Sequence, residues 1–364
     1  MTFLVTIGNG SMDRYSQKLA QHLRVPKLFT DVYQRVAELF NIPCLSPKAL
    51  KALWWDIRFV HRLRRLGDAV HLPNHHLGRY ALFLRQPYVI TVHDLIRYFD
   101  LRGYALYIHR PNARDRLYLR LDYEGIRRAP AIIAVSETTK RDLIRHLGIP
   151  EERIFVVYEG IDHSLFRPVE RRLVDYPYIL FVGSEHPRKN LVTLLRALRL
   201  LKDRNGRFRD LKLVKVGAAG GAEAPFRLRT LEAVRELGLE RDVVFTGTVP
   251  DEDLPAYYSG AEAYVSPSLY EGFGFPPLEA MACGCPVIVA NAGAQPEVVG
   301  DAALVVDPHD PEALAAALEE LLTDESLQRD LVQRGLQRAA QFTWERAARE
   351  TEAVYSSLPV LAPS

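Results

Sequence analysis

The sequence contains little cysteine, only three residues in a chain of 364. Cys44 stands alone, and Cys283 and Cys285 flank one glycine near the expected end of a helix. This pattern lacks the spacing of structural zinc ligands and offers no separate pair for a disulfide framework. We therefore expect buried small residues at a tight turn, and neither a metal site nor a redox centre.

Long apolar runs are also missing. The sequence has no stretch of about 18 consecutive apolar residues, the length that a membrane-spanning helix requires. Residues 1–8 lack the basic segment followed by an apolar segment that marks a signal peptide. We expect a cytoplasmic protein without a spanning helix.

The remaining composition is that of an ordinary globular protein, with 48% hydrophobic and 25% charged residues and enough length for two domain cores. The net charge of +2 hides an asymmetry, because residues 1–168 carry an excess of Lys and Arg and the rest an excess of Asp and Glu. This argues against a nucleic acid wrapped by the whole protein. It favours an anionic partner for the first half.

Short apolar runs alternate with helical patterns along the whole chain. Strands are expected in a first series at 3–7, 69–72, 88–92, 131–135 and 154–158, and in a second at 178–182, 211–216, 243–246, 263–265, 287–290 and 303–306. Such alternation predicts α/β domains with parallel sheets, which bind ligands beyond the carboxyl ends of their strands. We assign one domain to residues 1–168, a second to 169–342, and a terminal helix and tail to 343–364.

The stretch SPSLYEGFGFPPLEAMACGCP, residues 266–286, follows an expected strand and leads into a short apolar helix. Its glycines, including Gly272 and Gly274, let the backbone approach a ligand, and a proline in the first helical turn leaves free N–H groups that favour an anion. Glu271 and Glu279 bracket this loop. A phosphate cradle between two hydroxyl acceptors suits a nucleotide-sugar.

Cations stand at a second strand end of the same domain. Arg188 and Lys189 follow the expected strand 178–182 and Gly183, at the entrance to a helix. A guanidinium fork beside a point charge suits a diphosphate, although such a pair on a surface is often only solvated. We predict a phosphate role from its position at a carboxyl end.

Two features of the first domain allow two interpretations each. His93 lies at the carboxyl end of strand 88–92, where function concentrates, or it is a packed turn residue with Asp94 as a helix cap. The loop Gly8-Asn9-Gly10 contributes to a ligand site, or it is a tight turn before the helix.

Residues 47–67 form an amphipathic helical pattern. Leu53, Trp54 and Ile57 share one side with other apolar residues, and Lys51, Arg58, Arg62 and Arg65 share another. Such a helix can lie on an anionic membrane surface, or it can be a packed helix with a solvated charged face.

The acidic run Asp251-Glu252-Asp253 superficially matches the metal-binding motif of some sugar transferases. It follows Pro250 and precedes Leu254, which is how a helix begins, with acids in its first turn. We expect no metal there.

The run from Glu271 to Glu279 has the E-x7-E spacing of retaining family 4 glycosyltransferases with the GT-B fold, and the chain resembles that family. Further matches follow in the family's order: Thr91-Val92-His93-Asp94-Leu95, Val135-Ser136-Glu137-Thr138, Glu159-Gly160-Ile161-Asp162, Val182-Gly183 with Arg188-Lys189-Asn190, Gly247-Thr248-Val249-Pro250, Pro296-Glu297-Val298 and Phe342-Thr343-Trp344. The resemblance implies two Rossmann-like domains with parallel sheets facing across a cleft, and a terminal helix, here 344–358, that returns to the first domain.

The resemblance also implies residue roles. Arg188 and Lys189 would neutralise the departing nucleoside diphosphate, and His93 would touch the donor sugar near the reacting carbon. Glu271 would hold sugar hydroxyls with help from the backbone of Phe273 and Gly274, and Glu279 would accept from the ribose. The remaining donor contacts are expected at Gly10, Gly183, Val249 and Phe275. The family commonly carries adjacent glycines where this chain has Gly8-Asn9-Gly10, so the role of Gly10 stays open.

The sequence thus predicts a metal-independent retaining hexosyltransferase without a cofactor, which uses GDP-mannose or UDP-glucose as donor and a glycan or a lipid-linked acceptor. Contact with an anionic membrane would place it at the inner membrane face. Alternatives are a nucleotide-sugar epimerase on the same fold and a non-catalytic nucleotide-binding subunit. A phosphorylase of the pyridoxal type would need a cofactor lysine, for which no motif is present.

Overall fold

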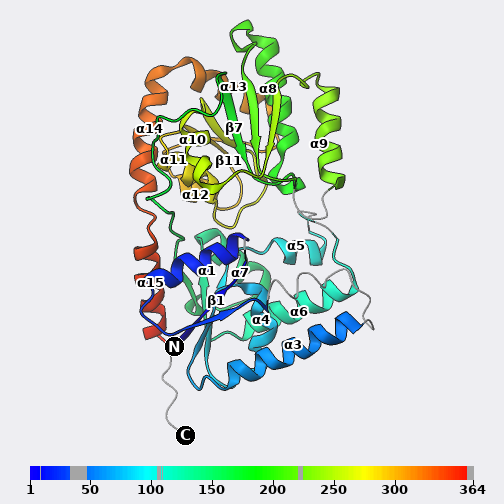
Figure 1. Cartoon of the computed structure of the whole chain (residues 1–364), viewed down its shortest axis with the longest axis vertical. Coiled ribbons are helices and arrows are strands. Elements are labelled where there is room, and N and C mark those ends of the chain that lie inside the picture. The colour runs from blue at the N-terminus through cyan, green and yellow to red at the C-terminus, as the bar shows by residue number, and fades with distance from the viewer. Residues whose placement is uncertain (9, 33–46, 105–107, 109, 220–223, 359–364) are drawn as a thin grey trace. The chain divides into compact units, whose positions relative to one another are not determined.

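The computed structural model describes residues 1–8, 10–32, 47–104, 108, 110–219 and 224–358, which belong to two compact units (Figure 1). The first unit comprises Met1–Gly160 and Trp344–Ser364, and the second comprises Ile161–Thr343. The division falls after Gly160, eight residues before the expected boundary at 168, and Ile161 pairs with Thr343 in a short parallel bridge. Residues 161–168 therefore belong to the second unit.

The first unit is built on a six-stranded sheet in the order β2-β1-β3-β4-β5-β6, in which every paired strand is parallel. Its strands are β1 (Thr2–Thr6), β2 (Lys27–Thr30), β3 (Val70–Leu72), β4 (Tyr88–Val92), β5 (Ala131–Ala134) and β6 (Ile154–Val156). Its helical segments are α1 (Ser11–His22), α3 (Pro47–Arg64), η1 (His75–Leu77), α4 (Gly78–Ala81), α5 (Ile96–Arg102), α6 (Ala113–Arg128), α7 (Glu137–Leu147), η2 (Glu151–Arg153) and α15 (Trp344–Ser356). The strands β4 and β5 are buried along their whole length, which explains their continuous apolar sequence.

The terminal helix α15 completes the first unit and packs on α1 (Figure 1). The Arg24 N–H donates to Glu352 Oε1 over 2.6 Å, and the rings of Tyr15 and Trp344 lie 5.9 Å apart. Deeper in the unit, Tyr355 Oη lies 2.6 Å from His71 Nδ1. An exposed hydrogen bond, a partly buried one and an aromatic contact therefore attach the end of the chain to the first unit.

The second unit repeats the plan with a sheet in the order β12-β11-β10-β7-β8-β9, again with every paired strand parallel. Its strands are β7 (Tyr178–Val182), β8 (Lys212–Val216), β9 (Val243–Gly247), β10 (Ala263–Ser266), β11 (Val287–Ala290) and β12 (Leu304–Val306). Its helical segments are η3 (Pro187–Lys189), α8 (Leu191–Arg204), η4 (Gly206–Phe208), α9 (Ala224–Glu236), η5 (Asp251–Asp253), α10 (Leu254–Ser259), α11 (Phe275–Ala282), α12 (Gln295–Val299), α13 (Pro311–Thr323) and α14 (Glu325–Ala339). The prediction of α/β domains with parallel sheets is confirmed.

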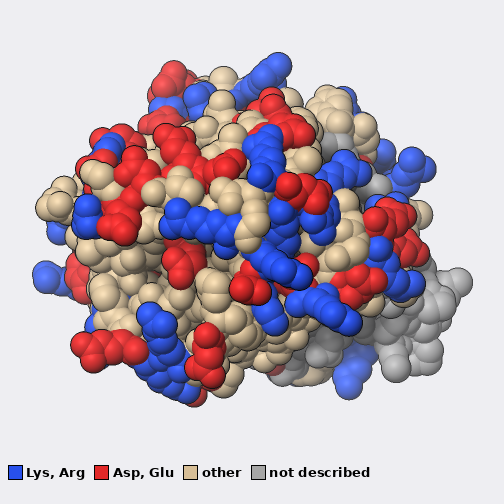
Figure 2. Space-filling view, turned by 90° about the horizontal axis from the view of Figure 1, so that it is seen from above, with Lys and Arg blue, Asp and Glu red and all other residues tan. Residues whose placement is uncertain are grey.

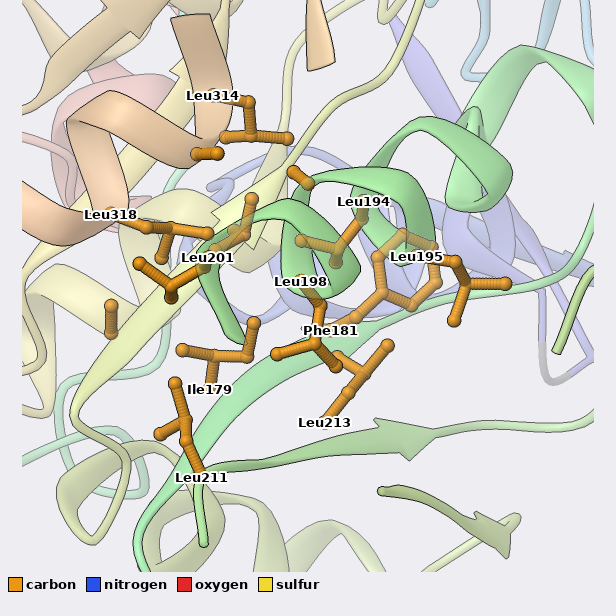
Figure 3. Close-up of a cluster of buried hydrophobic side chains, with 14 of the residues drawn as sticks. Ile179, Phe181, Leu194, Leu195, Leu198, Leu201, Leu211, Leu213, Leu314 and Leu318 are labelled. Carbon is orange, nitrogen blue, oxygen red and sulfur yellow. The ribbon is translucent and has the colours of Figure 1, made fainter. Parts of the chain in front are cut away.

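A large apolar cluster between the sheet and two helices stabilises this unit (Figure 3). Leucines of α8 at positions 194, 195, 198 and 201 cover Ile179 and Phe181 of β7 and Leu213 of β8, and Leu314 and Leu318 of α13 close the cluster. The leucines recur at helical spacing and are fully buried, so burial of apolar surface fixes α8 on the sheet. That position sets the loop between β7 and α8, which carries Arg188 and Lys189.

One sequence expectation about elements is wrong, and two short elements were missed. The helix expected from about 104 to 128 begins at Ala113 as α6, after the separate helix α5, and residues 105–107 and 109 of the expected range lie outside the described residues. Strand β2 was not expected, since it is a four-residue edge strand that alternates buried and exposed residues. Helix α12 was also not expected, because its five residues are too few to show a periodic pattern.

Surface charge of both signs is mixed on the face shown in Figure 2, where Lys and Arg side chains stand beside Asp and Glu. Several i,i+4 ion pairs lie along the described helices, among them Arg329 with Glu325 and Arg346 with Glu350. Exposed pairs of this kind contribute at most about 1 kcal/mol each. Within the described part of the chain, no helix is both long and apolar enough to cross a bilayer.

Candidate active site

The glycine loop predicted to bind phosphate lies in the second unit, between β10 and α11. Gly274 precedes the helix with a φ of 117°, a backbone conformation that favours glycine, and two prolines follow in the first turn. A second glycine, Gly293, approaches the loop so closely that an added Cβ would lie 2.5 Å from the backbone nitrogen of Glu271. Close packing of these backbones fixes Glu271 at the entrance to the helix.

Three predicted site residues meet at this entrance. Glu271 Oε2 lies 2.8 Å from Arg188 Nη1, and its Oε1 lies 2.8 Å from Lys189 Nζ. All three side chains are less than one-fifth exposed. The sequence assigned the two cations to a diphosphate and the carboxylate to a sugar, and the structure brings these groups into direct contact.

The electrostatics of this cluster determine the charge of Glu271. Burial raises the pKa of its carboxyl, but the charges of Arg188 and Lys189 outweigh burial and lower that pKa to about 2. Burial also lowers the pKa of Lys189, against the opposing effect of Glu271. At neutral pH the carboxylate of Glu271 is therefore ionised, which makes it a hydrogen-bond acceptor and not a general acid.

The loop after β7 is anchored to the same region. Asn190 adopts a left-handed conformation with a φ of 54°, and its Nδ2 donates to the carbonyls of Pro267 (3.0 Å) and Pro308 (2.7 Å). The Leu269 N–H donates to the Arg188 carbonyl over 2.7 Å. Gly183, with a φ of 149°, lies against the Lys189 side chain. These contacts hold the cation-bearing loop and the glycine loop together.

Glu279, the second predicted carboxylate, lies on α11 one turn beyond the helix entrance. Its Oε2 accepts a 2.8 Å hydrogen bond from the Tyr258 hydroxyl of α10. Burial, and after it the charge of Glu279, raises the pKa of Tyr258 well above its ordinary value, so the hydroxyl remains a donor. This bond fixes one oxygen of the carboxylate.

Sequence reasoning missed a second buried ion cluster at the ends of β7 and β8. Lys215 Nζ lies 3.1 Å from Glu185 Oε1, and Arg227 contacts both oxygens of the same carboxylate over 2.6 and 3.0 Å. Lys215 also donates to the carbonyls of Gly217 and Ala218. The sequence did indicate this cluster, because a lysine inside an apolar strand is expected to be buried and then requires a partner of opposite charge.

The first unit carries His93 at the end of β4. Its Nδ1 lies 2.8 Å from Glu159 Oε1, its Nε2 lies 2.9 Å from the Pro73 carbonyl, and its side chain is 10% exposed. Asp94 Oδ1 accepts from the Ile96 N–H over 2.9 Å ahead of α5, but the N-cap of this helix is Leu95 and not the Asp94 that the capping interpretation expected. Both ring nitrogens of His93 thus have protein partners, and its predicted contact with the donor sugar stays a prediction.

The other predicted contacts lie in the surroundings of the two clusters. Gly10 caps α1 and its N–H donates to Asp13 Oδ2 over 3.2 Å, which fits the tight-turn interpretation without testing a ligand role. Phe273 is buried with its ring 5.5 Å from that of Phe275, and Val249 follows β9. Their roles toward a donor, like those of Gly183, Gly274 and Glu279, stay predictions.

The residues considered for metal or redox chemistry have ordinary positions. Asp251–Asp253 forms the short helix η5 ahead of α10, and Asp253 pairs with Arg171 over 2.7 Å. Among the residues that the structure describes, no group of three or more His, Cys, Asp or Glu could hold a metal ion. Cys283 and Cys285 are buried free thiols, and Cys44 lies outside the described residues.

Comparison with known proteins shows the family of the chain. Residues 163–338 match the family model described as Glycosyl transferases group 1, and residues 15–165 match the model described as Glycosyltransferase Family 4. O-antigen chain mannosyltransferase B of Escherichia coli is 36% identical over 279 residues, which cover 74% of this chain and 70% of that protein. The chain belongs to this family of glycosyltransferases.

Two further relatives carry the name mannosyltransferase. MMP alpha-(1->4)-mannosyltransferase of Mycolicibacterium hassiacum is 36% identical over 300 residues, covering 79% of this chain and 70% of its own length. The serotype-specific mannosyltransferase WbdA of Escherichia coli is 32% identical over 274 residues, covering 71% of this chain but 32% of its own length. The glycosyltransferase therefore matches only about a third of WbdA.

Solved structures confirm the fold of the glycosyltransferase. Sucrose-phosphate synthase from Thermosynechococcus elongatus superposes with a TM-score of 0.76 at 24% identity, covering 98% of both chains. HepE of Anabaena, in complex with UDP and glucose, superposes with a TM-score of 0.79 at 20% identity, covering 98% of this chain and 100% of its own. The predictions of the GT-B fold and of a hexosyltransferase are confirmed, and the comparisons favour neither the epimerase nor the non-catalytic subunit.

Proposed function

We propose that this glycosyltransferase moves mannose, with retention of configuration and without a metal, from GDP-mannose to a glycan or lipid-linked acceptor. The observation that carries the proposal is the contact of Glu271 with Arg188 and Lys189 beside the glycine loop before α11. The mannosyltransferase names of the relatives support mannose. UDP-glucose is the second candidate donor, since HepE was solved with UDP and glucose.

Cleavage of the bond between the sugar and the diphosphate places negative charge on the departing oxygen. Arg188 and Lys189 are fixed cations that stabilise this charge in a partly buried site, where electrostatic interactions are stronger than in water. Arg188 Nη1 donates to Glu271 Oε2 over 2.8 Å and to the Tyr270 carbonyl over 3.2 Å, which fixes the guanidinium beside the glycine loop. The two cations supply the charge stabilisation that a metal ion supplies in other transferases.

The carboxylate of Glu271 has two tasks in this proposal. Without a donor, it holds the side chains of Arg188 and Lys189 in place through its two oxygens. With a donor bound, its oxygens accept hydrogen bonds from sugar hydroxyls as the sugar passes through its oxocarbenium-like state. The low pKa of Glu271 supports the second task, because an ionised carboxylate accepts at every physiological pH.

A thermal-shift series with sugar nucleotides tests the donor. A ligand at 100 times its Kd stabilises the folded state by about 2.7 kcal/mol, so GDP-mannose at saturation should raise Tm by several degrees. The variant R188A/K189A should lose this shift and retain its circular dichroism spectrum. A shift with neither GDP-mannose nor UDP-glucose would contradict the proposed donors, and an equal shift in the variant would contradict the proposed site.

Peripheral contact with an anionic membrane is the second part of the proposal, and α3 in the first unit supports it. The packed-helix interpretation requires the apolar side of α3 to be buried, but the structure buries Phe59 and Leu63 and leaves Leu53, Trp54 and Ile57 about half exposed. Large apolar side chains on a surface helix are typical of an interaction site.

Positive charge surrounds these exposed apolar residues. Among the described residues of α3, the exposed basic side chains include Lys51, Arg58, Arg62 and Arg64, and no exposed side chain is a carboxylate. Arg65 follows directly after the helix. The Arg58 guanidinium lies 4.6 Å from the Trp54 ring centre. Basic side chains beside apolar ones match an anionic lipid surface, where each cation contributes about 1 kcal/mol. A lipid-linked acceptor would be reached at such a surface.

A further inference from the structure

His93 of the first unit is held at both ring nitrogens by groups from two other strand ends. Its Nδ1 lies 2.8 Å from Glu159 Oε1, beyond the end of β6, and its Nε2 lies 2.9 Å from the carbonyl oxygen of Pro73, directly after β3. His93 itself follows β4. His93 and Glu159 are both more than nine-tenths buried. One imidazole therefore links the carboxyl ends of three parallel strands.

The chemistry of these partners determines the protonation of the ring. A carbonyl oxygen can only accept a hydrogen bond, so Nε2 carries a proton. With Glu159 ionised, its carboxylate can also only accept, so Nδ1 carries a proton as well. An imidazole with protons on both nitrogens is a cation, and the geometry points to a buried imidazolium paired with Glu159.

The neighbouring groups are consistent with this charge. His75 Nδ1 accepts from the His93 backbone N–H over 3.3 Å, which requires a free lone pair and hence a neutral His75. Burial, and after it the charge of His93, lowers the pKa of His71 and of His75 to about 3. The ring of Tyr15 meets His93 edge to face with 4.6 Å between ring centres and adds no charge.

The pKa of His93 itself results from opposing effects. Burial lowers it, but the hydrogen bond and charge of Glu159, the Pro73 carbonyl and the charge of Asp94 together raise it above its ordinary value. A raised pKa means that the folded protein holds the proton more tightly than the unfolded chain does. The imidazolium is therefore present at low pH and is lost as pH rises through a folded pKa that lies above the ordinary value.

We propose that Glu159 is a positioning residue that keeps His93 doubly protonated, so that His93 acts by its fixed charge and place and does not accept a proton. The inference rests on the proposed sugar transfer for its effect on rate, but not for the protonation state. With both N–H groups engaged, the ring has no lone pair with which to activate an acceptor hydroxyl. Proton removal from the acceptor must then use another base.

Nuclear magnetic resonance of the full-length protein labelled with ¹⁵N-histidine tests the protonation state directly. The signals of His93 are those that disappear in H93Q. At pH 7 they should be those of an imidazolium with both nitrogens protonated. Signals of a neutral ring with one unprotonated nitrogen would overturn the inference, whether or not sugar transfer is found.

The variant E159Q tests the effect on the reaction. Loss of the carboxylate should lower the His93 pKa, so the alkaline fall in kcat/KM should move to lower pH by about one unit or more. The control E152Q removes an exposed carboxylate of η2 and should keep the wild-type profile. If Glu159 had only a structural role, E159Q would lower Tm and leave the pH profile of kcat/KM in place. An unmoved pH profile would therefore overturn the inference. If E159Q fails to fold, the ¹⁵N-histidine spectrum of the wild type still tests whether both nitrogens of His93 are protonated.

Discussion

At the scale of single residues, the ion pairs of the candidate site depend on the charge of Glu271. This carboxylate is ionised because Arg188 and Lys189 counteract the effect of its burial. A buried charge with good partners on both oxygens is suited to accept hydrogen bonds and unsuited to donate a proton.

The variant E271Q should retain the fold and lose most of its sugar transfer. An amide keeps the shape of the side chain but removes the charge that orders the two cations, so we expect kcat to fall by roughly 10²–10³. The control E252Q changes an exposed glutamate of η5 and should transfer at the wild-type rate. A wild-type rate in E271Q would contradict the role given to this carboxylate.

The same residue makes a testable contribution to stability. The pKa of Glu271 falls from 4.5 to about 2 on folding. A lowered carboxyl pKa stabilises the folded state above the unfolded pKa, and the benefit is lost as pH falls through the folded pKa. Urea unfolding of the wild type should therefore show a free energy that declines between about pH 4.5 and 2, by on the order of 3 kcal/mol.

E271Q should lack this part of the decline, since an amide does not titrate. Comparison of the free energy of unfolding of the wild type and E271Q across that pH range separates the contribution of Glu271 from that of the other carboxyls. Parallel curves for the wild type and E271Q would show that the pKa of Glu271 is not lowered by its neighbours.

The residues of the candidate site could be predicted from sequence to different extents. Up to 83 positions of sequence separate Glu271 from Arg188 and Lys189. Their proximity in the structure could be predicted, because each follows a strand of the same parallel sheet. Their direct ion pairs could not be predicted, because side-chain contacts depend on loop geometry. The partner of His93 was missed for the same reason, although Glu159 also follows a strand.

At the scale of elements, apolar periodicity predicted the long helices and the central strands well. Helix α8 has leucines at helical spacing, and its burial follows from them (Figure 3). Short elements such as β2 and α12 were missed because four or five residues carry too little pattern. For α3, sequence alone could not show which apolar residues pack, since the helix carries apolar residues on more than one side.

The exposed side of α3 should mediate binding to anionic vesicles. The variant R58Q/R62Q/R65Q should bind vesicles that contain phosphatidylglycerol more weakly than the wild type, by an equilibrium constant about 10-fold or more lower in low salt. Wild-type binding should weaken as salt rises, because salt screens these charges. The measurement is co-sedimentation at several salt concentrations.

A matched control changes cations on a different surface. The variant R329Q/R334Q changes two arginines of α14 in the second unit, which pair with Glu325 and Asp330. It should bind vesicles as the wild type does. Equal loss in both variants would indicate non-specific charge attraction, and no binding of the wild type in low salt would contradict the membrane contact.

At the scale of the whole molecule, the chain consists of two similar units, each with a six-stranded parallel sheet. Repetition of strand and helix was enough to predict this architecture, and several motifs in one order were enough to predict the family. The boundary at Gly160 was less predictable, because residues 161–168 contact a segment distant in sequence, as in the bridge of Ile161 with Thr343 and the contact of His163 with the Phe342 carbonyl. The acceptor depends on surface chemistry that has no general code in sequence.

Proton magnetic resonance of the reaction tests whether the protein transfers a sugar from a sugar nucleotide with retention of configuration. Incubated with GDP-mannose or UDP-glucose, the wild-type protein should consume the donor and release a nucleoside diphosphate. The first sugar product, whether transferred to an added acceptor or released by slow hydrolysis, should have the anomeric configuration of the donor. Consumption of neither donor, or a first product with inverted configuration, would contradict the account.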